Sequence, residues 1–106
     1  MEQIFNKLVR DNIPDIIIKN GGKPYTRLLT DSEFRIELIK KLNEEYNEVI
    51  NSSGKERIEE LADMIEVIKY LAICEGSTLE EVINVSNEKA LKRGAFDKRI
   101  FLERTE

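Results

Sequence analysis

Residues 30–76 read TDSEFRIELIKKLNEEYNEVINSSGKERIEELADMIEVIKYLAICEG, and this stretch decides the fold. Thr30-Asp31-Ser32-Glu33 is a helix start signal of the capping-box type, and Ser53-Gly54-Lys55-Glu56 is a second one. After each signal, apolar residues recur every three or four positions, as they do on one face of a helix. The stretch therefore predicts two helices, one from Thr30 to about Asn51 and one from Ser53 to Gly76.

Two further helices flank this pair. Asp11 or Asn12 can cap a first helix that holds Pro14 in its first turn and stops at Gly21-Gly22. Ser77-Thr78-Leu79-Glu80 is a third capping box, and the helix that it opens should stop at Gly94. Residues 23–29 read as extended chain, and the tail (residues 95–106) fits either an extended arm or a final helical turn.

Short connections favour antiparallel neighbours, so we expect an all-α fold, a small four-helix antiparallel bundle. The length of 106 residues predicts a single domain over residues 1–106. A chain of this size holds one modest core, and a large active-site cleft would need a second subunit. We therefore expect the bundle to be completed by oligomerisation.

Composition excludes several classes of function. The net charge of −4 argues against binding to nucleic acid polymers, which calls for a basic face. The chain has no histidine, which excludes imidazole–zinc sites and Ser–His or Cys–His catalysis. The lone Cys74 lies in an apolar helical run and predicts a buried thiol in a reducing compartment. Without a signal peptide or an apolar run near the roughly 20 residues that span a bilayer, we expect a cytoplasmic protein without membrane contact.

One carboxylate of the predicted helix 30–51 falls among apolar positions. A helical wheel, at about 100° per residue, gathers an apolar stripe on one face. Its members are Phe34, Leu38, Ile39, Leu42, Tyr46 and Val49. Glu45 lies inside this stripe and Glu48 on its border, whereas Glu44 points to solvent. A carboxylate among core positions is unfavourable unless it is paired or binds a metal. The alternative for Glu45 is a surface pair with Lys41, four residues earlier.

The predicted helix 53–76 gathers acids on one arc, formed by Glu56, Glu59, Glu60, Asp63 and Glu66. Its main apolar face lies opposite and consists of Ile58, Leu61, Ala62, Ile65, Ile68 and Ala72. Each pair of like charges three or four residues apart destabilises an isolated helix by about 0.2–0.5 kcal/mol, which suggests that the arc has a use. Val67 and Cys74 continue the arc with apolar side chains and predict that this side is partly buried. Glu56 also has a structural interpretation, as the partner of the Ser53 cap.

The acids of the two helices can meet across an antiparallel turn. Glu45 and Glu60 would both lie on the order of 10 Å from the turn, at a rise of about 1.5 Å per residue. The hairpin would then present Glu45, Glu48, Glu60 and Asp63 at similar height. Carboxylates without histidine or cysteine select a hard cation, Mg²⁺ or Mn²⁺. The alternative is a solvated acidic face.

The same acids carry a resemblance to a known superfamily. Glu44-Glu45-x-x-Glu48 followed by Glu60-x-x-Asp63 resembles the EExxE…ExxD pattern of the all-α nucleoside triphosphate pyrophosphohydrolases. That superfamily contains MazG-like proteins, dimeric dUTPases and phosphoribosyl-ATP pyrophosphohydrolase. Residues 7–14 (KLVRDNIP) and 92–101 (KRGAFDKRIF) are similar to its phosphoribosyl-ATP pyrophosphohydrolase-like, house-cleaning branch. The resemblance covers nearly the whole chain.

The resemblance implies Mg²⁺-dependent hydrolysis of nucleoside triphosphates, including non-standard ones, to a monophosphate and pyrophosphate. It implies that Glu45, Glu48, Glu60 and Asp63 are the metal ligands. Glu59 or Glu56 would be the general base or would support the ligands. We also expect a homodimer or homotetramer whose substrate is a nucleoside triphosphate.

A triphosphate also needs positive side chains to bind it. The candidates are Lys7 and Arg10 before the first helix, Lys89, Lys92 and Arg93 near the end of the last helix, and Lys98 and Arg99 in the tail. Asn87 could donate a hydrogen bond to a base or sugar. Lys and Arg in a last helical turn also favour the helix dipole, so these residues have a structural interpretation as well.

Two other functions stay open at this point. Phosphoribosyl-ATP pyrophosphohydrolase of histidine biosynthesis would use the same metal site, although residues 7–14 and 93–101 favour the house-cleaning branch. A non-catalytic helical dimerisation or regulatory module, with an acidic arc that meets a basic partner, would not respond to magnesium.

Overall fold

The computed structural model describes residues 2–106, and its regular structure is entirely helical. The helices are α1 (Ile13–Lys19), α2 (Asp31–Ile50), α3 (Gly54–Cys74) and α4 (Leu79–Arg93), with no strand among the described residues. The prediction of a small all-α fold with four helices is confirmed. The bounds of α2, α3 and α4 closely match those predicted from the start and stop signals.

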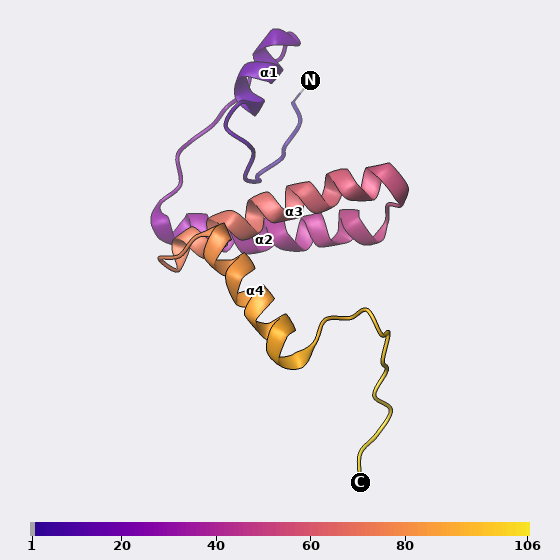
Figure 1. The fold of residues 1–106 in the computed structure, drawn as a ribbon. Helices are drawn as coiled ribbons and strands as arrows, with labels where there is room; N and C mark the ends of the chain where they lie inside the picture. Colours follow the sequence, from indigo (N-terminus) through magenta and orange to yellow (C-terminus); the bar gives the residue numbers. More distant parts are fainter. Residues whose placement is uncertain (1) are drawn as a thin grey trace.

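The antiparallel hairpin of α2 and α3 forms the centre of the molecule (Figure 1). Leu38 is 2% exposed, and Val67 and Ala72 are also buried. The rings of Phe34 and Tyr70 meet edge to face, with centroids 6.3 Å apart. Among the helices of residues 2–106, α4 packs against α3 alone and α1 packs against none. The core of the described chain therefore lies between α2 and α3.

Helix α2 begins at the capping box that the sequence predicts. The Thr30 hydroxyl accepts a hydrogen bond from the Glu33 amide at 3.3 Å, and the Glu33 carboxylate accepts one from the Thr30 amide at 3.0 Å. Helix α4 is capped by Thr78, whose hydroxyl accepts from the Glu81 amide at 3.1 Å. The predicted box on Ser77 was therefore wrong by one residue.

The turn between α2 and α3 is built without a capping box. The Ser53 side chain makes no cap hydrogen bond, so the predicted box and the capping role of Glu56 are wrong. Instead, the Val49 carbonyl accepts hydrogen bonds from the Ser52 hydroxyl and from Arg57 Nε, each at 3.0 Å. Gly54 has a φ of 58°, in the left-handed region that glycine adopts without strain.

Helix α3 turns its acidic arc, and not its main apolar face, toward α2. Val67 is buried and Cys74 half-buried, so this side is partly buried as predicted, but the prediction of a buried thiol at Cys74 is wrong. The opposite face is open over the first half of α3, where Ile58 and Ile65 are exposed, whereas Ala72 near the end of the helix is buried. The reason is that a single partner helix covers only one side of α3, and Val67 and Leu71 already supply apolar contact there.

Both ends of the described chain are extended, beyond α1 on one side and beyond α4 on the other (Figure 1). An N-terminal strap (residues 2–12) precedes α1, and the tail follows α4 on the other side of the hairpin. Of the two conformations expected for the tail, the extended arm is present, with one turn closed by the Arg99 amide and the Phe96 carbonyl at 3.1 Å. Within residues 2–106, no helix combines the length and the apolar character needed to cross a membrane.

Candidate metal centre

Three carboxylates from the two central helices converge near the middle of the hairpin. One oxygen each from Glu45 of α2 and from Glu60 and Asp63 of α3 lie within 4.8 Å of one another. The antiparallel turn brings them together because these residues stand at comparable distances from it along the chain. The structure thus unites three of the four acids that the sequence proposes as ligands.

Glu45 is the most buried of the three acids. It is only 7% exposed, as its place within the apolar stripe of α2 predicted. Burial raises the pKa of the Glu45 carboxyl, and the negative charge of Asp63 raises it further. Lys41 Nζ lies 3.9 Å from Glu45 Oε1 and 3.4 Å from Glu44 Oε1. The lysine is therefore shared with a neighbour and only partly compensates the buried charge.

Glu60 is half-buried and faces other acids from both helices. Desolvation raises the pKa of the Glu60 carboxyl, followed by the charges of Glu48, Asp63 and Glu56. Glu48 itself is exposed and lies outside the group of three converging oxygens, in keeping with its border position on the wheel. It is close enough to act on Glu60 through its charge.

The N-terminal strap reaches the acids through two of the predicted cations. Arg10 Nη2 donates to Asp63 Oδ1 at 2.9 Å, and Arg10 Nη1 donates to Glu66 Oε2 at 3.4 Å. Lys7 Nζ lies 3.5 Å from Glu44 Oε1. We call this set of pairs the strap clasp. The sequence places Glu66 on the acidic arc, three residues after Asp63, but does not count it among the candidate site residues.

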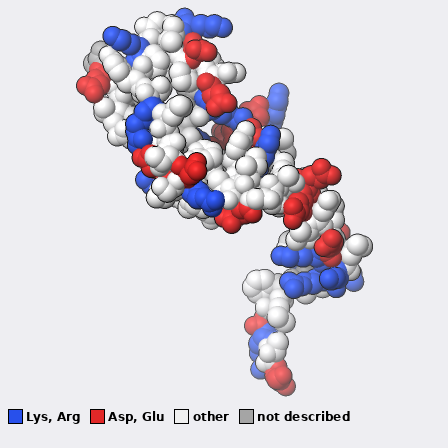
Figure 2. Space-filling view, turned by 90° about the vertical axis from the view of Figure 1, so that its left-hand side faces the viewer, with Lys and Arg blue, Asp and Glu red and all other residues white. Residues whose placement is uncertain are grey.

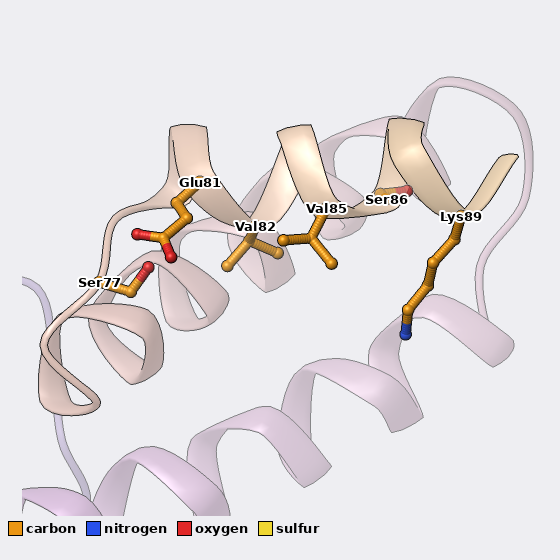
Figure 3. Close-up of a pocket in the computed structure, with 6 residues that line it drawn as sticks. All are labelled: Ser77, Glu81, Val82, Val85, Ser86 and Lys89. Atoms are coloured by element: carbon orange, nitrogen blue, oxygen red, sulfur yellow. The ribbon is translucent and has the colours of Figure 1, made fainter. Parts of the chain in front are cut away.

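The remaining predicted site residues lie farther out. Glu56 and Glu59 are exposed on α3. The candidates of α4 and the tail, which are Asn87, Lys89, Lys92, Arg93, Lys98 and Arg99, are all exposed. They lie across the hairpin from the strap (Figure 1), and Lys and Arg side chains gather where α4 gives way to the tail (Figure 2). Lys89 extends from α4 along a shallow groove that Val82 and Val85 also line (Figure 3).

The raised pKa values of Glu45 and Glu60 predict how the stability of the metal-free protein depends on pH. Where the folded pKa exceeds the unfolded value, the folded chain keeps protons that the unfolded chain has lost, so the free energy of unfolding falls as pH rises. Glu33 acts in the opposite sense, but its pKa is lowered from 4.5 to about 2, mainly by Arg27, so its effect is confined to more acidic pH.

We therefore expect the urea midpoint of the metal-free protein, measured in EDTA, to fall as the pH is raised from about 4.5 to about 7. In the variant Glu45→Gln, which cannot titrate at this position, the fall should be smaller. Urea titrations of both proteins at several pH values measure the two slopes. Equal slopes would show that Glu45 does not carry the effect.

The donors at this site fit a hard divalent cation. Carboxylate oxygens are the ligands that Mg²⁺ and Mn²⁺ prefer, and positive charge would relieve the mutual repulsion of Glu45, Glu60 and Asp63. The exposed position of Glu48 leaves it free to supply a fourth ligand. Comparisons of the chain with protein-family models, curated proteins and solved structures found no match.

Proposed function

We propose that this chain is a Mg²⁺-dependent nucleoside triphosphate pyrophosphohydrolase that releases a monophosphate and pyrophosphate. The observation that carries the proposal is the convergence of buried Glu45 with Glu60 and Asp63 within 4.8 Å. The resemblance of the Glu44–Asp63 pattern to the all-α pyrophosphohydrolases supports the choice of reaction. A house-cleaning role on non-standard nucleotides in the cytoplasm would suit that resemblance.

In this proposal Glu45, Glu60 and Asp63 hold the Mg²⁺, or a Mn²⁺, and Glu48 joins them from the rim. A cation at this position would supply the charge that activates water near neutral pH and offsets the negative phosphates. Glu56 and Glu59 are candidates to accept the proton of the attacking water, because both are exposed on the acidic arc of α3. The charge of Glu56 raises the pKa of Glu60, so by this criterion Glu56 lies nearer to the site than Glu59 does.

The strap clasp supplies the phosphate-binding side chains in this proposal. Arg10 forms ion pairs with Asp63 and Glu66. A metal cation bound by Asp63 would compete with Arg10 for the Asp63 carboxylate. Once released, the guanidinium can form paired hydrogen bonds with phosphate oxygens. Lys7 lies beside Glu44, so its side chain can reach the same side of the hairpin as Arg10. Cations of α4 and the tail rank behind these two because they lie across the hairpin.

Replacing Arg10 separates its two roles. We expect Arg10→Met to tighten Mg²⁺ binding by about two- to fivefold, because an exposed ion pair contributes at most about 1 kcal/mol. The same variant should raise the KM for the nucleotide. Isothermal titration with Mg²⁺ and steady-state kinetics measure the two effects. Arg27→Met is the matched control, since Arg27 pairs with Glu33 at the start of α2. Weaker Mg²⁺ binding in Arg10→Met would contradict the competition.

A pyrophosphate-release screen tests the function itself. Standard and damaged nucleoside triphosphates would be assayed beside phosphoribosyl-ATP, each with and without Mg²⁺, and the products identified by mass spectrometry. Pyrophosphate and a monophosphate, formed only with the metal, are the expected products. Turnover of phosphoribosyl-ATP alone would point to the biosynthetic enzyme. No turnover together with no change of melting temperature in millimolar Mg²⁺ would favour the non-catalytic module.

A further inference from the structure

The N-terminal strap is attached to the hairpin by few contacts. Within residues 2–106, no backbone hydrogen bond joins the strap to α2 or α3. Leu8 is half-buried, and the other residues of the strap are exposed. In the described chain, the ion pairs that join the strap to the hairpin are those of the strap clasp, which Lys7 and Arg10 form. The attachment of the strap therefore depends mainly on charge.

The strap clasp has anchors on both helices that supply the candidate metal centre. Lys7 Nζ lies 3.5 Å from Oε1 of Glu44, the residue that precedes Glu45 in α2. Arg10 Nη2 lies 2.9 Å from Oδ1 of Asp63 in α3. In Figure 1 the strap descends from its N-terminal end to the hairpin and rises again into α1. The strap therefore lies beside the converging acids and uses one of them as an anchor.

The anchor at the metal centre is the shortest of the three ion pairs. The pair with Asp63 measures 2.9 Å, whereas those with Glu66 and Glu44 measure 3.4 and 3.5 Å. The latter two carboxylates are also shared with lysines of the hairpin. Lys69 Nζ lies 3.8 Å from Glu66 Oε1, and Lys41 Nζ lies 3.4 Å from Glu44 Oε1. Loss of the Asp63 pair would therefore leave the strap with its two weaker anchors.

We propose that the strap is closed over Asp63 in the metal-free protein and opens when a divalent cation binds there. This inference rests on the proposed metal centre. The guanidinium of Arg10 has the same sign of charge as the cation, so the two compete for Asp63 and repel each other. Exposed ion pairs are weak and give way readily. The closed strap thus withholds Arg10 and Lys7 from a triphosphate until the metal is in place.

Limited trypsin digestion of the folded protein measures how far the strap is open. Trypsin must take the Arg10 side chain into its specificity pocket to cleave before Asp11, and the ion pairs with Asp63 and Glu66 prevent this. We expect cleavage after Arg10 to be about two- to fivefold faster in millimolar Mg²⁺ than in EDTA, in keeping with exposed ion pairs. Because coupling is reciprocal, this factor should match the tightening of Mg²⁺ binding in Arg10→Met. Mass spectrometry of the fragments over time gives the rate.

The bond between Arg27 and Leu28 is the control within the same digest. Like Arg10, Arg27 is exposed in a segment without regular structure, and its Nη2 lies 2.8 Å from Glu33 Oε2. Glu33 is not one of the converging acids. A general weakening of ion pairs by added salt would speed cleavage at both bonds. Competition at Asp63 speeds cleavage after Arg10 alone.

A variant at Glu66 loosens the strap without altering a proposed ligand. Glu66→Gln should raise the rate of cleavage after Arg10 in EDTA by about twofold, because it removes one exposed ion pair. It should keep the rise of the wild-type melting temperature with Mg²⁺. Glu75→Gln is the matched control, since Glu75 pairs with Arg35 at the same distance of 3.4 Å. The control should be cleaved after Arg10 at the wild-type rate.

The melting temperature of the same samples separates the possible outcomes. If it rises with Mg²⁺ while cleavage after Arg10 stays constant, or quickens equally at both bonds, the opening of the strap is overturned and the metal centre stands. A melting temperature that does not respond to Mg²⁺ overturns both. Glu66→Gln protein that is cleaved in EDTA like wild type also contradicts a strap held by the clasp. A strap that opens with Mg²⁺ in a protein that releases no pyrophosphate would support the inference and contradict the proposed function alone.

Discussion

We expect Asp63→Asn to lower the rate of pyrophosphate release by at least about 100-fold while the helices remain intact. The amide keeps the size of the side chain but removes the charge that holds a cation beside Glu45 and Glu60. A metal that stabilises phosphoryl chemistry contributes several kcal/mol, and each 1.36 kcal/mol corresponds to about a tenfold change in rate. Steady-state pyrophosphate release at saturating Mg²⁺ and circular dichroism measure the two quantities.

Glu48→Gln should cause a comparable loss if the exposed Glu48 joins the site as proposed. Glu37→Gln is the matched control, because Glu37 lies on the same helix and pairs with Lys40 at 3.1 Å. The control should retain wild-type turnover. Turnover near that of wild type in both Asp63→Asn and Glu48→Gln would show that the proposed site is wrong. Loss in Asp63→Asn alone would confine the site to the three converging acids.

The second large effect concerns Glu45 and is thermodynamic. Mg²⁺ at about 100 times its dissociation constant should stabilise the wild-type fold by about 2.7 kcal/mol and raise the melting temperature by about 10 °C or more. Glu45→Gln should abolish that response. The same substitution should raise the urea midpoint of the metal-free protein, because a neutral amide replaces a buried carboxylate that Asp63 repels.

Thermal and urea melts in EDTA and in Mg²⁺, with Glu37→Gln alongside, measure these opposite changes. A Glu45→Gln protein that still gains stability from Mg²⁺ would remove Glu45 from the ligand set. A metal-free Glu45→Gln protein less stable than wild type would mean that the carboxylate contributes hydrogen bonds that outweigh its desolvation.

The sequence predicted the helices and part of the site because both depend on local spacing. The Thr30 box fixes the start of α2, and the position of Glu45 within an apolar stripe predicts its burial. The cap of α4 was misplaced because Ser77 and Thr78 are both good capping residues, and spacing alone does not choose between them.

The faces of α3 and the strap clasp could not be predicted in the same way. A helical wheel shows which residues share a face, but α3 has apolar residues on two faces and the wheel does not say which one meets α2. The pair of Arg10 and Asp63 joins residues 53 positions apart in the chain. No local period links such positions, so only the folded structure could show that Glu66 completes the clasp.

The strap clasp also means that the protein carries its own counter-ion. Before a metal arrives, the guanidinium of Arg10 partly neutralises Asp63 and Glu66, so the acids of α3 can stand together at a smaller electrostatic penalty. Ionic strength sets how firmly this internal cation is held, because the pairs are exposed and the Debye length is about 8 Å at physiological salt. The strap, which contains no helix, thus ties the charge state of the hairpin to the salt around it.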